Sequence, residues 1–414
     1  MAAPRMDVVR RRIAEWEPRI RAFATLDEAA FARPDAAKGP LSGIATGVKD
    51  VLDVAGLPTR NGSRACDGAG PAQADAPVVA ALRAGGADIL GKTVTTEFAF
   101  IDPTDCRNPH DLTRTPGGSS SGSGAAVGAG VLDLAVGTQT AGSLCRPAAY
   151  CGAVGLKPGI GVLPTEGMTP LAPSFDAPGF IARDVQTAAA AFAACTDSAL
   201  SARLANGLRL GRALLDPDAP MSDAALSALA EAAEALQGLS LSLTHAATGL
   251  SFAAIVADHR TVMLAEAAAA HGHLLDSATD RLRPRFAAAL AEGRTLDRAD
   301  IATARQRLAA ARDRFWDEMD GFDLLLAPPV PDGAPSLDAG TGYQNLLTPW
   351  TVFAGPLLAL PWGLDALGRP RSVMLAARPG QEALVLAAGA ALEPLGPPLP
   401  RPALPLGDLV VQSG

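Results

Sequence analysis

Residues 116–130 consist almost entirely of glycine, serine and alanine, and their place in the chain decides how they should be interpreted. Taken alone, the stretch is typical of a low-complexity segment or a flexible linker. It runs directly, however, into residues 131–136, which have the composition of a core strand. A flexible linker is not usually embedded in this way, so we interpret residues 116–130 as a Gly/Ser loop that belongs to a folded core.

Strand-like and helix-like segments alternate over most of the chain. The predicted strands are 44–54, 87–90, 131–136, 323–327 and 373–377. The predicted helices are 8–30 with an interruption at Pro18, 76–84, 185–195, 223–237 behind an N-cap at Ser222, 252–271, 297–319 and 382–392. The alternation predicts an α/β fold, in which helices cover both faces of a large mixed, mostly parallel central sheet.

The composition favours a folded, acidic protein. Of the 414 residues, 48% are hydrophobic and 19% are charged, which is enough apolar material for a sizeable buried core. With a net charge of −8, the chain lacks the concentration of positive charge that binding a nucleic acid would require, so no such partner is expected. The five cysteines include no CxxC pair, which favours neither a disulfide framework nor a zinc site. We therefore expect a reducing, cytoplasmic setting.

No membrane segment is predicted. The N-terminal segment carries Asp7 and Glu15 and lacks the apolar region of a secretory signal. The longest apolar stretches, 188–195 and 383–392, fall well short of the roughly 20 residues that span a bilayer. We therefore expect neither a leader peptide nor a membrane span.

Lysine is rare in this chain. Of the 35 basic residues, only four are lysine, at positions 38, 49, 92 and 157, and the remaining 31 are arginine. Arginine stays protonated in proteins, whereas a buried lysine can lose its proton. Each lysine is therefore a candidate for a role that arginine could not fill, although chance survival explains any single one.

Residues 86–93, Gly-Ala-Asp-Ile-Leu-Gly-Lys-Thr, match the P-loop pattern GxxxxGK[ST]. A phosphate-binding loop requires a strand before the first glycine and a loop between the two glycines. Here a helical run precedes Gly86, and residues 87–90 are themselves strand-like. We interpret the match as the end of a buried strand.

Residues 118–122 match the nucleophile elbow GxSxG, which requires a preceding strand and a later acid and histidine. The preceding Pro-Gly-Gly is a poor strand. Histidines follow only in the alanine-rich helical region, at positions 245, 259, 271 and 273, and His110 precedes the motif. We place the later four in or beside polar helix faces and interpret all five as satisfied or solvated side chains, so the predicted catalytic set contains no histidine.

A different set of segments remains. Lys49 lies in the predicted strand 44–54, Ser119 lies in the Gly/Ser loop, and Ser143 ends the run 137–143, Gly-Thr-Gln-Thr-Ala-Gly-Ser. Together with residues 147–158, Pro-Ala-Ala-Tyr-Cys-Gly-Ala-Val-Gly-Leu-Lys-Pro, these segments resemble the amidase signature family. The resemblance is strong over about 40–180 and weaker near 322–329 and 355–393.

The resemblance implies an amidase signature fold with a single domain over residues 1–414. Within this domain, it implies three parts. They are a signature core at about 40–180, a helical middle region at about 185–320, and closing strands and a helix at about 322–395.

The resemblance also implies a role for each of three residues. Ser143 would be the nucleophile, Ser119 a bridging serine that follows a cis peptide bond, and Lys49 the base. Elementary chemistry agrees, because a serine hydroxyl needs a neighbouring base, and a lysine can serve as that base only if burial lowers its pKa. The backbone N–H groups of Thr140, Ala141, Gly142 and Ser143 are the implied oxyanion hole.

The chain departs from the family pattern near the predicted nucleophile. Gln139 stands where many members have aspartate, and Ala141 where many have glycine, so the oxyanion loop is expected to be slightly altered in shape. Many members also have an arginine two residues after the nucleophile, where this chain has Cys145. The arginine follows as Arg146, an arrangement that resembles malonamidase-type members. Arg146 either binds a substrate carboxylate or forms a structural ion pair, and the sequence favours neither.

These observations predict hydrolysis of a small carboxamide to a carboxylate and ammonia or an amine, through an acyl-enzyme on Ser143 and without a cofactor or metal. The expected partner is the amide substrate alone, and whether the chain forms a homodimer is left open. One alternative is an amidotransferase A-type subunit that supplies ammonia to a partner. Another is a non-catalytic binding protein on an amidase scaffold. The sequence does not identify the substrate.

Overall fold

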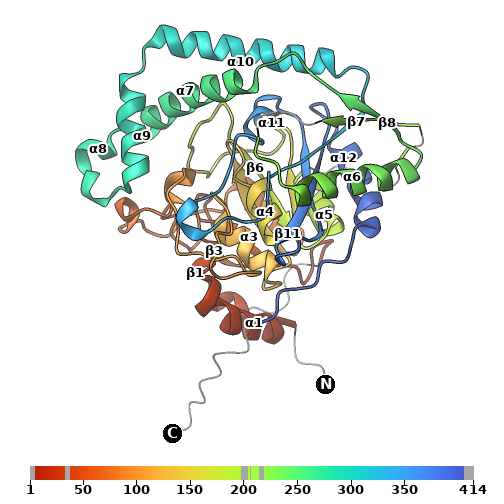
Figure 1. The fold of residues 1–414 in the computed structure, drawn as a ribbon. Helices are drawn as coiled ribbons and strands as arrows, with labels where there is room; N and C mark the ends of the chain where they lie inside the picture. Colours follow the sequence, from red (N-terminus) through yellow and green to blue (C-terminus); the bar gives the residue numbers. More distant parts are fainter. Residues whose placement is uncertain (1–4, 33–37, 197–203, 206, 214–218, 405–414) are drawn as a thin grey trace.

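Eleven strands form one continuous sheet in the computed structural model, which describes residues 5–32, 38–196, 204–205, 207–213 and 219–404 (Figure 1). In chain order the strands are β1 (Phe23–Leu26), β2 (Ala45–Lys49), β3 (Asp88–Thr93), β4 (Leu134–Gln139), β5 (Val154–Lys157), β6 (Ala177–Ala182), β7 (Arg209–Ala213), β8 (Ser242–Ala246), β9 (Leu324–Ala327), β10 (Leu357–Leu364) and β11 (Pro370–Ala376). Across the sheet their order is β1-β3-β2-β4-β6-β5-β10-β11-β9-β7-β8. Strands from the start, middle and end of the chain therefore share one sheet.

The sheet is mixed, as predicted, but it is less parallel than expected. Among the described strands, the four pairings of β2 with β3 and β4, and of β7 with β8 and β9, are parallel. The other six pairings are antiparallel. The expectation of a mostly parallel sheet was therefore wrong, because β4, β6 and β5, which are close in sequence, pair antiparallel.

Helices surround the sheet, which confirms the α/β class. They are α1 (Arg5–Ile20), α2 (Pro77–Ala84), α3 (Ser121–Gly128), α4 (Cys145–Cys151), α5 (Val185–Thr196), α6 (Asp223–Gly238), α7 (Phe252–His271), α8 (Leu274–Ser277), α9 (Pro284–Thr295), α10 (Arg298–Glu318), α11 (Thr348–Val352) and α12 (Glu382–Leu392). α3 and α4 pack on each other and on the sheet, while α5, α6 and α12 form a second group against it. α7, α9 and α10 lie further out, at the top and left of Figure 1.

The five helices predicted after residue 180 lie within two residues of their predicted bounds, whereas α8, α9 and α11 were not predicted. Ser222 caps α6 as predicted, because its hydroxyl accepts a hydrogen bond from the Ala225 N–H at 3.2 Å. The predicted helix 8–30 is wrong in its second half. α1 ends at Ile20 with Pro18 inside it, and β1 follows. β10 was not predicted, since Pro361 interrupts its apolar run, and its register against β11 shifts between Pro361 and Leu364.

The Gly/Ser loop is only partly a loop. Residues 121–128 form α3, a helix that is buried over almost its whole length, and β4 begins at Leu134 rather than at residue 131. A Cβ atom on Gly122 would lie 2.1 Å from the Ala22 carbonyl oxygen. The small residues therefore let this helix pass directly against neighbouring backbone.

The core strands β2 and β4 are buried at every residue. The segments that follow them are therefore anchored at their first residue by a buried strand. Within the described ranges, none of the helices has the length and apolar character needed to cross a membrane.

Candidate active site

The side chain of Lys49 contacts Ser119, which belongs to the Gly/Ser loop. Lys49 is the last residue of β2 rather than the middle of a longer strand as predicted, so its side chain lies at the carboxyl end of that strand. Its Nζ atom donates to Ser119 Oγ and to Thr138 Oγ1 of the neighbouring strand β4, each at 2.7 Å. The peptide bond between Gly118 and Ser119 is cis, the isomer that the resemblance implied.

The Lys49 ammonium group lies in an environment that favours loss of its proton. The residue is completely buried, and none of the carboxylates in the described residues forms an ion pair with it. Burial lowers its pKa to about 7, although the charge of Asp176 acts in the opposite direction. Lys92 shows the contrasting case, because it is buried but forms an ion pair with Asp50 at 2.9 Å. Lys49 is therefore not the salt-bridged structural lysine that the sequence left open.

The three consecutive serines at 119–121 have different surroundings. The Ser120 hydroxyl donates to the Thr138 carbonyl at 3.3 Å, and the Ser121 hydroxyl donates to the Gly117 carbonyl at 2.7 Å. Of the three, only Ser119 contacts the lysine through its hydroxyl. The geometry thus distinguishes Ser119 from its neighbours without reference to the resemblance.

The loop 140–143 connects β4 to α4 and ends at Ser143. It is joined to the Gly/Ser segment by the Ser120 N–H, which donates to the Ser143 carbonyl at 3.1 Å. Ser143 keeps 7% exposure, whereas Ser119 has none, and no bond joins their hydroxyl groups among the hydrogen bonds of the described residues. Within the same residues, the backbone N–H groups of Ala141, Gly142 and Ser143 donate to no protein acceptor. They remain available to a ligand.

Gln139 holds the turn that carries Ser143. Its Oε1 atom accepts from the N–H groups of Leu144 and Cys145 at 3.1 and 3.0 Å, which caps the start of α4. Its Nε2 atom donates to Thr351 Oγ1 at 3.2 Å, and that hydroxyl donates to the Ala141 carbonyl at 2.7 Å. The departure from aspartate is thus accommodated, because the amide supplies a donor that a carboxylate lacks.

Arg146 is buried and bonded to backbone. Its Nη2 and Nε atoms donate to the Gly118 carbonyl at 2.6 and 3.2 Å. Longer bonds run to Thr341 Oγ1 at 3.3 Å and to the Gly342 carbonyl at 3.4 Å. Burial lowers its pKa to about 10. No carboxylate of the described residues pairs with it, so the expected alternative of a structural ion pair is not found there.

Sequence reasoning missed three residues that contact this loop, namely Thr351, described above, Asp176 and His259. Asp176 accepts a hydrogen bond of 2.5 Å from Thr140 Oγ1, and His259 Nε2 lies 2.9 Å from the Thr140 carbonyl oxygen. His259 was placed on a polar helix face but is 3% exposed. In the alanine-rich sequence of α7, apolar and polar residues are not clearly separated, so the sequence did not indicate that His259 lies on a buried face. Nothing in the sequence indicated Asp176.

A cavity of about 460 Å³ lies near the loop 140–143, although none of the predicted site residues lines it. Its walls come from four segments that are far apart in sequence: Phe100, Ile101, Val256, His259, Arg260, Met263, Arg285, Ala288, Ala289, Glu292, Gln344, Asn345 and Thr348. His259 contacts Thr140, and Thr348 follows Leu347, the side chain nearest to Gly142. The cavity is therefore adjacent to the loop.

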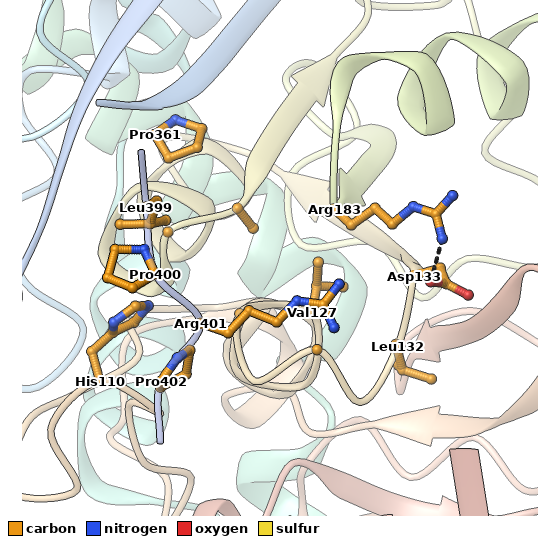
Figure 2. Close-up of a pocket in the computed structure, with 14 residues that line it drawn as sticks. His110, Val127, Leu132, Asp133, Arg183, Pro361, Leu399, Pro400, Arg401 and Pro402 are labelled. Carbon is orange, nitrogen blue, oxygen red and sulfur yellow. Dashed lines mark hydrogen bonds and ion pairs between the residues drawn. The ribbon is translucent and has the colours of Figure 1, made fainter. Parts of the chain in front are cut away.

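A second cavity of about 160 Å³ lies at the opposite ends of α3 and α4 (Figure 2). Arg401 lies close to Gly130 there, and Arg183 forms an ion pair with Asp133 at 2.7 Å. Ser119 and Ser143 precede the other ends of these two helices, so this cavity is not the candidate active site.

The remaining sequence motif has a structural explanation. Residues 88–93 of the P-loop match form β3, so the interpretation as a buried strand end is confirmed. No group of three or more His, Cys, Asp or Glu side chains in the described ranges is arranged to hold a metal ion.

Comparisons with known proteins show the family and the fold of this chain. Residues 11–386 match the family described as Amidase. The chain is 32% identical to the A subunit of glutamyl-tRNA(Gln) amidotransferase of Anaeromyxobacter sp. (strain K), over 94% of this chain and 89% of that protein. It is 33% identical to the AtzE subunit of 1-carboxybiuret hydrolase of Pseudomonas sp. (strain ADP), over 86% and 85% of the two chains. A crystal structure of an amidase superposes with a TM-score of 0.87 at 28% identity, covering 95% of this chain and 96% of the other.

Proposed function

Because this chain belongs to the amidase signature family, whose members and structural neighbours are hydrolases of C–N bonds, we propose that it hydrolyses a small carboxamide through an acyl-enzyme on Ser143. One observation carries the proposal. The amine of Lys49, buried without a carboxylate partner among the described residues, lies 2.7 Å from Ser119 Oγ. A lysine with a pKa of about 7 is in part neutral at neutral pH and can accept a proton.

The reaction proceeds in two halves. Ser143 Oγ attacks the carbonyl carbon, and its proton passes through the Ser119 hydroxyl to Lys49 Nζ. The C–N bond then breaks as the leaving nitrogen takes up that proton, which yields ammonia or an amine. A water molecule attacks the acyl-enzyme by the same relay, and the carboxylate leaves.

The oxyanion loop supplies the second element of catalysis. Negative charge develops on the carbonyl oxygen when Ser143 attacks. The N–H groups of Ala141, Gly142 and Ser143 have no acceptor among the described residues and are the proposed donors to that charge. The Thr140 N–H, the fourth expected donor, likewise has no acceptor among the hydrogen bonds of the described residues, and the carbonyl and hydroxyl groups of Thr140 bond to His259 and Asp176.

A fluorophosphonate probe tests the proposal without knowledge of the substrate. Its phosphorus bonds to Ser143 Oγ as fluoride leaves, so wild-type protein should be labelled and Ser143→Ala should not. Lys49→Arg should abolish labelling although it keeps the charge, while the exposed Lys38→Arg should not change it. Labelling that persists in Ser143→Ala would exclude this nucleophile. Wild-type protein inert to the probe would instead favour a binding protein.

We further propose that the amide carries a carboxylate and that Arg146 binds it. The support is that Arg146 has no acidic partner in the described residues, and that one relative is named for a carboxylated substrate. Ammonia release should be compared for amides with and without a free carboxylate. In Arg146→Ala, the acidic amides should lose more rate than the neutral ones. An equal loss on both would leave Arg146 with only its structural bonds to Gly118, Thr341 and Gly342.

A second candidate function is that of a subunit that feeds ammonia to a partner enzyme. It is favoured because two relatives that match most of this chain are themselves named as subunits. Co-purification of a partner, together with glutamine-dependent ammonia release, would support it. Turnover of small amides by the chain alone would favour the simple hydrolase.

A further inference from the structure

The loop 140–143 is held by side chains from distant parts of the chain. His259 of α7 and Thr351 of α11 each bond to a backbone carbonyl of this loop. The two helices pack on each other and belong to the helical middle region and the closing region, outside the signature core. Both residues are buried, with 3% and 0% exposure. Their hydrogen bonds therefore have no competition from solvent.

Each of these bonds fixes the plane of one peptide group. In a trans peptide the C=O and the following N–H point in opposite directions across a rigid plane. His259 Nε2 contacts the Thr140 carbonyl at 2.9 Å, which directs the Ala141 N–H to the other side. Thr351 Oγ1 donates to the Ala141 carbonyl at 2.7 Å and so directs the Gly142 N–H. These two N–H groups are consecutive along the chain, and both lack an acceptor in the described residues.

The surroundings of both side chains determine which group donates. Burial lowers the pKa of His259 to about 4, so the ring is neutral at pH 7, and its Nε2 carries the hydrogen that the carbonyl accepts. The ring packs against Phe175 at a centroid distance of 4.3 Å, which fixes its orientation. Thr351 accepts from Gln139 Nε2 at 3.2 Å, which leaves its own hydrogen for Ala141. Each donating side chain is thus fixed in its orientation by a second contact.

We infer that His259 and Thr351 are positioning residues that aim the Ala141 and Gly142 N–H groups at the developing oxyanion. The inference rests on the proposed function, because it assumes that these N–H groups stabilise that charge. It assigns the helical middle region a part in catalysis through its contact with the loop. It also accounts for Gln139, whose amide orients the Thr351 hydroxyl.

The rate of Ser143 labelling by a fluorophosphonate in the full-length chain tests this inference. Thr351→Val and His259→Leu should lower the labelling rate constant about tenfold to hundredfold, because a small displacement of a donor has effects of this size. Apparent affinity for the probe should change little. Thr351→Ser and His259→Gln retain a donor and should restore most of the rate. Thr303→Val and His273→Gln are matched controls on exposed positions.

The outcomes separate the inference from the proposed function. Wild-type protein that does not react would overturn the function itself. Folded Thr351→Val and His259→Leu proteins that react at the wild-type rate would overturn only the inference. So would conservative variants that lose as much rate as the apolar ones. Should His259→Leu fail to fold, the isosteric Thr351→Val decides alone. The pH at which labelling reaches half its maximum should stay unchanged in all four, since Lys49 is not altered.

Discussion

Lys49 combines burial with two hydroxyl partners, and this combination makes a pH dependence the most direct consequence at the level of single residues. Because its pKa is lowered to about 7, the group is protonated below that pH and neutral above it. Only the neutral amine accepts the Ser119 proton. The active fraction should therefore increase as the pH rises through this value and level off above it.

We expect the Ser143 labelling rate to fall about tenfold per pH unit on the acidic side and to be constant on the alkaline side. The measurement is a pH series with a fluorophosphonate, corrected for hydrolysis of the probe in buffer. Ser143→Ala gives the background. A rate that is level across the neutral range would contradict a lysine base with this pKa.

Asp176 is the charged group that acts on Lys49 from the loop before β6, while the adjacent Asp50 is already paired with Lys92. Its negative charge favours protonated Lys49. Asp176→Asn should therefore lower the Lys49 pKa and move the acidic limb of the labelling profile to lower pH. Burial raises the pKa of Asp176 itself, and the hydrogen bond from Thr140 acts against this rise. An unmoved limb in Asp176→Asn would rule out this electrostatic effect.

How far a residue's role could be predicted depended on whether its partners are local. Ser143 and Lys49 stand in recognisable segments, and the structure joins the segments of both to the serines at 119–121. Choosing Ser119 over Ser120 required the resemblance, because the three serines differ only in their tertiary contacts. His259 contacts a residue that is 119 positions away, which no local pattern encodes.

At the level of elements, α3 shows how composition can mislead. Its glycines and serines are poor helix formers, yet the segment is a helix because only small residues fit against the backbone around it. Helices with a capping residue or a clear start, such as α6 behind Ser222, were predicted almost to the residue. Strand ends were less predictable, because β2 and β4 end where the loops of the candidate site begin.

A pair of glycine substitutions tests this view of α3. Gly122→Ala would place a Cβ atom 2.1 Å from the Ala22 carbonyl oxygen, so we expect a loss of about 2 kcal/mol or more in the free energy of unfolding. Gly238→Ala, in the last turn of α6, meets no described atom within 4 Å. It should be neutral or stabilise by about 0.5 kcal/mol. Chemical denaturation measures both, and equal effects would contradict the close packing of α3.

At the level of the whole molecule, the sheet order links distant parts of the chain. β10 and β11, from the closing region, lie between β5 of the signature core and β9. Beyond β9, the sheet continues with β7 and then β8. Sequence reasoning placed all three regions in a single domain, but it could not predict this order, because strand neighbours in a mixed sheet depend on long-range pairing.

If the chain is one domain, it should unfold as one unit. We expect a single transition in which tryptophan fluorescence and Ser143 labelling are lost together on heating. Of the four tryptophans, Trp350 and Trp362 report on the closing region, Trp16 on α1 and Trp316 on α10, and labelling reports on the signature core. Two separate transitions would indicate that the closing region and the core are independent units.

The burial of lysine has a practical consequence for handling the protein. Three of the four lysines, Lys49, Lys92 and Lys157, have no exposed surface, and Lys38 is exposed. Amine-directed reagents should therefore attach a dye or a solid support at Lys38 while the folded chain shields the lysine in the candidate site. Because lysine is scarce, Lys38 is thus a nearly unique surface site on this chain for coupling chemistry.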